Sequence, residues 1–128
     1  MIYIDSSVAL ARLLFERHAP PPRFWEQRLA SSRLLEYEVW NRVHAYHLSD
    51  SSRQAARTLL LGIDLFELDR LALSRALEPW PTPLRILDAL HLATMDYLRS
   101  EGEPVDLASY DTRLTAAAAA MGFPLAAL

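Results

Sequence analysis

Four acidic residues in this chain of 128 residues stand at positions where carboxylate chemistry is possible. Asp5 follows an apolar run at the start of the chain, and Asp111 follows a second such run near its end. Asp88 and Glu38 fall on or beside the apolar faces of two helical patterns. A carboxylate that faces a core is costly unless it is paired or binds a metal, and the chain has no lysine to pair with it. Together the four acids predict a single oxygen-rich site of the kind that Mg²⁺ or Mn²⁺ prefers.

Each acid also has a simpler interpretation. Asp5 and Asp111 both stand where a helix N-cap is expected. Glu38 can pair with Arg42 four residues later on the same helix. Asp88 lies near the start of a helix, where a negative charge is favourable for the helix dipole.

Periodicity leaves some neighbouring candidates open. It does not choose between Glu36 and Glu38 for the position that faces the site. Asp106 lies inside an apolar run, and its role is undecided. His91 shares the mixed face of Asp88, where a packed and hydrogen-bonded histidine is more common than a metal ligand.

The elements that must position these residues alternate between strand and helix. This alternation predicts an α/β fold in a single domain over residues 1–128, with a short parallel sheet of about four to five strands and helices on both faces. In such a sheet, ligands collect at the carboxyl ends of the strands. The predicted strands are 1–4, 63–68, 105–109 and 123–125; the predicted helices are 8–15, 24–30, 33–49, 50–61, 69–78, 84–99 and 112–121.

Composition removes several classes of chemistry. Without cysteine the chain has no disulfide, no thiol nucleophile and no cysteine-ligated zinc. Without lysine it has no Walker-type phosphate loop and no Schiff base, and its three glycines form no dinucleotide-binding fingerprint. The net charge of −3 argues against a basic surface coat for nucleic acid, but not against a site where metal ions meet phosphate. No stretch is apolar enough for a membrane span and no targeting segment is evident, so we expect a cytoplasmic protein.

Four stretches of the sequence, in order, resemble the PIN-domain ribonucleases, and in particular the VapC-type toxins of bacterial toxin–antitoxin pairs. The most specific stretch is the third, which is similar to the family's Asp-Ala-x-His-Leu-Ala-Thr signature. The resemblance spans almost the whole chain. The four stretches are MIYIDSSVALARLL, SSRLLEYEVWNRV, LRILDALHLATM and LASYDTRLTAAAAAMGFPL.

The resemblance assigns the catalytic and metal-binding positions to the same four acids, Asp5, Glu38, Asp88 and Asp111. It also matches three further residues to family positions. Ser7 and Ser109 are expected to hydrogen-bond or orient the carboxylates, and Arg85 matches a frequent basic position that would contact RNA. The segment 29–31 matches the family's usual second strand poorly, which puts that strand in doubt.

The family implies a metal-dependent endoribonuclease that leaves 5′-phosphate and 3′-hydroxyl ends and acts as a toxin. Its cofactor would be Mg²⁺, with Mn²⁺ as the alternative, as one ion or two. The implied partners are an RNA substrate, a VapB-type antitoxin that blocks the site, and a second copy of the chain, in a homodimer and a toxin–antitoxin hetero-oligomer. The antitoxin groove would draw on apolar residues of the first helices, although most of these also suit an ordinary core: Leu13, Leu14, Phe15, Phe24 and Trp25.

Two other functions fit the sequence less well. A phosphoreceiver-like signalling domain is also a small α/β fold with acids at strand ends, but it needs paired acids after the first strand and a lysine, both of which are missing here. A catalytically silent PIN-like scaffold would bind only a protein partner. The presence of all four acids argues against that loss of activity.

Overall fold

A four-stranded parallel sheet forms the centre of the protein, whose structure here is a computed structural model describing residues 1–128. The strands lie in the order β3-β2-β1-β4, and every neighbouring pair is parallel. The predicted parallel α/β sheet is therefore confirmed. The strands are β1 (Ile2–Ile4), β2 (Leu29–Ser32), β3 (Ile63–Phe66) and β4 (Asp106–Ala108).

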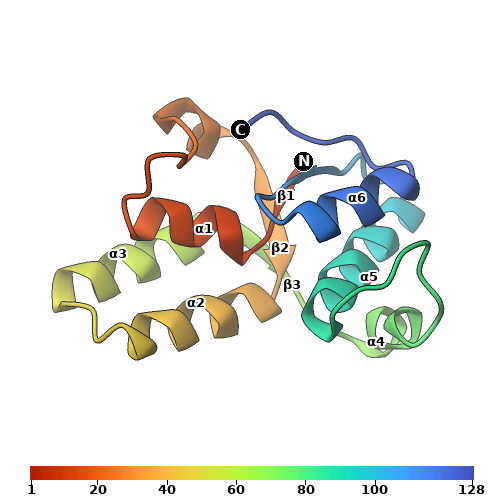
Figure 1. The fold of residues 1–128 in the computed structure, drawn as a ribbon, viewed down its shortest axis with the longest axis horizontal. Helices are drawn as coiled ribbons and strands as arrows, with labels where there is room; N and C mark the ends of the chain where they lie inside the picture. Colours follow the sequence, from red (N-terminus) through yellow and green to blue (C-terminus); the bar gives the residue numbers. More distant parts are fainter.

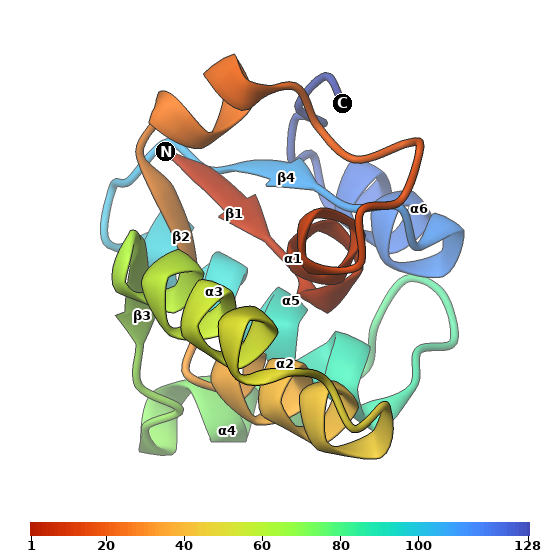
Figure 2. The ribbon, with the colours of Figure 1, turned by 90° about the vertical axis from the view of Figure 1, so that its left-hand side faces the viewer.

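Helices cover both faces of this sheet (Figure 1). Helices α1, α2 and α3 lie on one side, and α4, α5 and α6 lie on the other (Figures 1 and 2). None of the helices is both long and apolar enough to cross a lipid bilayer. The helices are α1 (Ser6–Leu13), α2 (Leu34–Ala45), α3 (Asp50–Leu61), α4 (Arg70–Ala76), α5 (Ile86–Ser100) and α6 (Thr112–Ala120), with a short 3₁₀ helix, η1 (Pro22–Glu26).

Two hydrophobic cores lie on the two faces of the sheet, because side chains alternate along a strand. In β1, Tyr3 belongs to the core under α5 and α6, and Ile4 belongs to the core under α1, α2 and α3. In β4, Leu107 and Ala108 divide in the same way. Tyr3 is thus a polar-tipped side chain that points from the sheet toward α5.

The prediction for residues 24–30 was wrong, and the doubtful second strand exists. The chain forms η1 and then β2, which lies between β1 and β3. All four residues of β2 are buried, including Ser31 and Ser32. Their hydroxyls are satisfied locally: Ser31 Oγ donates to the Ile4 carbonyl (2.7 Å), and Ser32 Oγ accepts from the Leu34 N–H (3.0 Å). Backbone partners therefore let a weak strand sequence occupy a central position.

The final predicted strand, residues 123–125, is reduced to a single bridge. Leu125 pairs with Leu107 in parallel, and the Leu107 N–H donates to the Pro124 carbonyl (2.9 Å). Other elements are shorter than predicted: α2 stops at Ala45 rather than at residue 49, and β3 stops at Phe66 rather than at 68. These differences lie at the ends of elements and leave the four acids on their predicted elements.

Candidate active site

Two of the acids lie side by side at the carboxyl edge of the sheet. Asp5 directly follows β1 and Asp111 follows β4, and these two strands are neighbours, with Ile4 opposite Ala108. Because parallel strands end at the same edge, both acids stand where an α/β fold places ligands. Asp88, in the first turn of α5, and Glu38, in α2, approach the same edge from the two helix layers.

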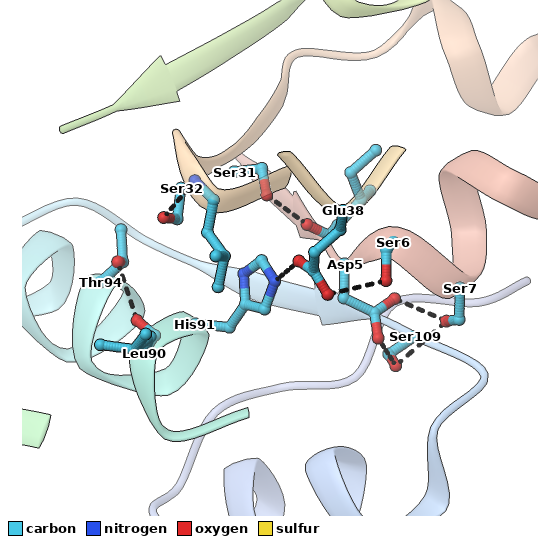
Figure 3. Close-up of polar contacts among 12 residues, drawn as sticks. Asp5, Ser6, Ser7, Ser31, Ser32, Glu38, Leu90, His91, Thr94 and Ser109 are labelled. Atoms are coloured by element: carbon cyan, nitrogen blue, oxygen red, sulfur yellow. Dashed lines mark hydrogen bonds and ion pairs between the residues drawn. The ribbon is translucent and has the colours of Figure 1, made fainter. Parts of the chain in front are cut away.

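Asp5 is a buried carboxylate held by two serine hydroxyls, and only 5% of the residue is exposed. Ser7 Oγ donates to Oδ1 (2.6 Å) and Ser109 Oγ donates to Oδ2 (2.7 Å), as drawn in Figure 3. Asp5 occupies the N-cap position of α1, as expected, but its side chain makes no capping bond, so helix capping does not account for this carboxylate. Burial raises the pKa of Asp5, while the hydrogen bonds from Ser7 and Ser109 oppose that rise. The two serines lie where the resemblance expected them.

Asp111 does cap its helix. Its Oδ1 accepts from the N–H groups of Arg113 (2.9 Å) and Leu114 (3.3 Å) at the start of α6. The two interpretations of this residue are compatible, because capping uses only one of the two carboxylate oxygens. The Ser109 hydroxyl also accepts from the Asp111 N–H (2.9 Å), which links this turn to Asp5.

Asp88 has an unsatisfied carboxylate. Its Oδ2 is buried and has no hydrogen-bond partner. Burial raises the pKa of Asp88, the charges of Asp111 and Asp5 raise it further, and His91 and Arg85 act in the opposite direction. The charges of Asp5 and Asp111 are therefore close enough to affect the Asp88 carboxylate, one oxygen of which has no hydrogen-bond donor.

Glu38 is held at both of its oxygens by residues from other elements. His91 Nε2 in α5 lies 2.5 Å from Oε1, and Ser6 Oγ in α1 donates to Oε2 (3.1 Å) (Figure 3). The alternative pair with Arg42 does not form, since Arg42 hydrogen-bonds Tyr46 instead. Glu38 is thus directed toward the sheet edge and not toward its own helix surface.

The two undecided acids lie elsewhere. Glu36 pairs with Arg33 (3.4 Å) at the start of α2. Asp106 begins β4 and lies opposite Ile2, at the amino end of the strands. That end is away from the edge where Asp5 and Asp111 stand, so neither Glu36 nor Asp106 joins the cluster.

The donor chemistry of the cluster fits a hard divalent cation. It offers four carboxylates, one of which has a buried oxygen without a partner. As the side chains are placed, no three His, Asp or Glu side chains are arranged so that they could hold a metal ion together. An ion bound at this site would therefore require at least one of the carboxylates to turn toward the others.

Sequence reasoning missed two residues of this site, Ser6 and Tyr3, and underused a third, His91. Ser6 adjoins Asp5 but serves Glu38. The Tyr3 hydroxyl lies 2.8 Å from His91 Nδ1. His91 was expected to be packed and hydrogen-bonded, which is confirmed, but its partners come from elements far apart in sequence. The one available signal was a tyrosine two residues before the first acid, in an otherwise aliphatic strand.

Known proteins share both this sequence pattern and this fold. A family model of the PIN domain matches residues 2–120. Ribonuclease VapC35 of Mycobacterium tuberculosis is 32% identical over 133 residues, which cover 99% of this chain and 96% of that protein. Ribonuclease VapC46 of the same species is 35% identical, with 98% and 96% covered.

Two solved structures have the same fold. The M. tuberculosis toxin VapC20, described as cleaving the sarcin-ricin loop, aligns with a TM-score of 0.66 at 18% identity, covering 91% of this chain and 95% of its own. A toxin–antitoxin complex from Klebsiella pneumoniae aligns with a TM-score of 0.62 at 19% identity, covering 91% of each chain. The parallel sheet, the four acids at its carboxyl edge and the full-length matches lead to one assignment. This chain belongs to the PIN-domain family, among the VapC ribonucleases.

Proposed function

We propose that this protein is a metal-dependent endoribonuclease that acts as the toxin of a toxin–antitoxin pair. The observation that carries the proposal is the cluster of four carboxylates at the carboxyl edge of a PIN-type sheet, with Asp5 buried and Asp88 lacking a partner. The full-length similarity to proteins named as VapC ribonucleases supports the same activity.

The metal would be held by Asp5, Glu38, Asp88 and Asp111. Mg²⁺ suits such a set of oxygen ligands, and Mn²⁺ suits it as well. A bound ion would lower the pKa of a water molecule and neutralise charge on the phosphate. The chain itself contributes by holding Asp5 through two serine hydroxyls, so that this carboxylate keeps one orientation at the sheet edge.

RNA would approach from the side of Arg85. A hollow of about 600 Å³ lies beside the acids, between the loop before α5 and the start of α6. Arg85 and Arg113 both line it and are exposed. The hydroxyl-bearing Thr82 and Thr112 line it as well. Neither arginine forms a salt bridge, so both guanidinium groups are available to phosphate, which arginine binds in a bidentate manner.

An antitoxin segment would lie over the first helices. A second hollow of about 600 Å³, with a mainly apolar lining, is formed by α1, η1 and α3. Phe15 lines it, is 90% exposed and has a positive φ of 53°, which is unusual for a large residue. Of the five apolar residues expected in this groove, Leu13, Phe15 and half-buried Trp25 line the hollow, whereas Leu14 and Phe24 do not. Leu13 and Phe24 belong to the core. An exposed aromatic at the rim of an apolar hollow fits a protein partner.

Two copies of the protein would associate in a homodimer. Five large apolar residues remain exposed on α4, directly after it, and at the start of α5. Burying them between two copies would remove apolar surface from water. The residues are Leu71, Leu73, Leu77, Ile86 and Leu87. Sedimentation of the purified protein alone, and again with its antitoxin, would give the two stoichiometries.

The decisive experiment expresses the protein without a partner and maps new RNA 5′ ends across the transcriptome. We expect a discrete set of cuts with 5′-phosphate ends, absent in the Asp88→Asn variant and present in the control Asp50→Asn, an exposed aspartate in α3. The purified protein should lose cleavage in excess EDTA and regain it with Mg²⁺. Full cleavage by Asp88→Asn would contradict the assignment, and a wild-type protein that binds its partner but never cuts RNA would favour the silent scaffold.

A further inference from the structure

A buried chain of hydrogen bonds connects the sheet to Glu38. The Tyr3 hydroxyl in β1 lies 2.8 Å from His91 Nδ1, and His91 Nε2 lies 2.5 Å from Glu38 Oε1. His91 is only 1% exposed, and Tyr3 is fully buried. Their rings meet edge to face, with 5.7 Å between centroids. Figure 3 shows the His91 ring reaching from α5 to the Glu38 carboxylate of α2.

The donors and acceptors around Tyr3 determine which nitrogen of His91 carries a proton. The Tyr3 oxygen accepts from the Ser32 N–H (2.9 Å). The two neighbouring hydroxyls donate their hydrogen bonds to backbone carbonyls: Ser31 donates to Ile4, and Thr94 donates to Leu90. Burial raises the pKa of Tyr3 well above its ordinary value, so its hydroxyl keeps its proton. The acceptor left for that proton is His91 Nδ1.

The hydrogen bond at Nδ1 determines the state of the other nitrogen of the imidazole ring. If Nδ1 accepts from Tyr3, neutral His91 must carry its proton on Nε2. Nε2–H then donates to Glu38 Oε1, while Ser6 donates to Oε2. Each oxygen of the glutamate therefore has one fixed donor and retains lone-pair capacity for a cation.

From this geometry we propose that Tyr3 and His91 are positioning residues, which hold the Glu38 carboxylate toward the acid cluster through an Nε2–H tautomer of His91 that Tyr3 selects. The chain of bonds joins both helix layers, because Tyr3 and His91 belong to one side of the sheet and Glu38 comes from α2 on the other. The inference rests on the proposed function, since it takes Glu38, which these hydrogen bonds position, to be a ligand of the metal ion. Carboxylates that bind metals are commonly held by such outer hydrogen bonds, whose loss costs about 10–100-fold in metal affinity or activity.

The first test measures Mn²⁺ binding to the full chain by calorimetry. His91→Leu removes the donor to Glu38 and should weaken Mn²⁺ affinity by about 10–100-fold. His91→Gln keeps an N–H group near the position of Nε2 and should recover most of that loss. Tyr97→Phe, which removes the hydroxyl of a half-buried tyrosine in α5 with no side-chain hydrogen bond, is the control and should bind as wild type does.

The second test reads the tautomer by ¹⁵N NMR of the metal-free protein and needs neither metal nor RNA. Wild type should show a protonated Nε2 and an unprotonated Nδ1, and Tyr3→Phe should shift the ring toward a mixture of tautomers. A proton on Nδ1 in wild type, or wild-type Mn²⁺ affinity in folded His91→Leu, would overturn the inference. If His91→Leu does not fold, His91→Gln and Tyr3→Phe decide it: the inference fails if Tyr3→Phe changes neither the tautomer nor Mn²⁺ affinity.

The two tests also separate this inference from the proposed function. A wild-type protein with the Nε2–H tautomer but without Mn²⁺ binding would overturn the metal site and, with it, the positioning role. A wild-type protein that binds Mn²⁺ and cleaves RNA while all His91 and Tyr3 variants bind equally well would overturn the positioning role alone.

Discussion

Asp5 is the most enclosed of the four acids, and two serines decide how it is presented. One serine lies two residues away in sequence, and the other comes from the opposite end of the chain, 104 residues later. A buried carboxylate without donors would be protonated or displaced. At this position the protein therefore provides the carboxylate with two hydroxyl donors rather than with a cationic side chain.

Loss of one of these donors should be measurable in folding. Ser109→Ala removes the bond to Asp5 Oδ2, and we expect a loss of about 1.5–3 kcal/mol in the free energy of unfolding, the range for hydrogen bonds to charged groups. Urea unfolding measures it. Ser100→Ala, an exposed serine that donates to the Tyr97 carbonyl, should change stability by less than about 0.5 kcal/mol. Equal effects of the two substitutions would show that Asp5 does not depend on Ser109.

The charged form of Asp88 should lower the free energy of unfolding of the metal-free protein. Because burial raises its pKa, the folded protein holds this proton to a higher pH than the unfolded chain does, so its stability contribution falls as pH rises through the folded pKa. Asp88→Asn removes the charge and should raise the free energy of unfolding of the metal-free protein near pH 7 by about 1 kcal/mol, a modest value because solvent screens a partly exposed group.

The pH dependence of the free energy of unfolding tests whether Asp88→Asn stabilises the protein for this reason. Near pH 4, close to the ordinary pKa of an aspartate, the gain from Asp88→Asn should shrink because a larger fraction of the wild-type carboxyl is then protonated. Chemical unfolding at both pH values measures the difference. A variant less stable than wild type near pH 7 would contradict the description of Asp88 as an unsatisfied anion.

At the scale of elements, α5 holds the site together. It carries Asp88 in its first turn and His91 about one turn later, and the side chains of Leu92 and Met95 anchor it in the core. Since an α-helix is rigid over such a distance, the depth at which Leu92 packs determines where both polar groups reach the sheet edge. The position of the site thus depends on packing beneath it.

Truncation of that anchor should therefore be costly. Leu92→Ala should lower the free energy of unfolding by about 2–5 kcal/mol, because Leu92 is fully buried and a cavity would remain. Leu87→Ala in the same helix, at a residue 46% exposed, should cost clearly less. Thermal and urea denaturation of both variants would test this, and similar losses would mean that α5 is not anchored through Leu92.

At the scale of the whole molecule, the negative charge is concentrated where a cation would bind. The chain has 16 acidic residues and 13 basic ones, and four of the acids form the site. The rest of the chain therefore carries 13 arginines against 12 acids. Beside this acidic site, Arg85 and Arg113 form an exposed cationic rim around the neighbouring hollow.

This distribution predicts a salt-dependent contribution from the rim. In an Asp88→Asn background, in which we expect no cleavage, Arg113→Gln should weaken RNA binding and lower the slope of log K against log salt by about 1, as expected for one lost phosphate contact. Fluorescence anisotropy at several salt concentrations measures it. Arg23→Gln, an exposed arginine on η1, should leave the slope unchanged; a slope unaffected by Arg113→Gln would place RNA elsewhere.

The sequence alone predicted the alternation of strands and helices and the parallel sheet, because local periodicity carries this information. The resemblance to the PIN-domain ribonucleases implied the four acids and the two serines near them, whereas periodicity left the choice between Glu36 and Glu38 open. The same information was insufficient for β2, because Leu29–Ser32 has little strand character of its own and is stabilised by neighbours on both sides.

Tertiary structure decided what each acid touches. It directed Glu38 rather than Glu36 toward the site, brought Ser109 to the Asp5 carboxylate, and placed His91 between Tyr3 and Glu38. The Tyr3–His91, His91–Glu38 and Ser109–Asp5 contacts join residues that are 88, 53 and 104 positions apart in sequence, so no local pattern encodes them. They exist because packing of the two helix layers brings polar groups to one sheet edge, where each buried donor and acceptor must find a partner.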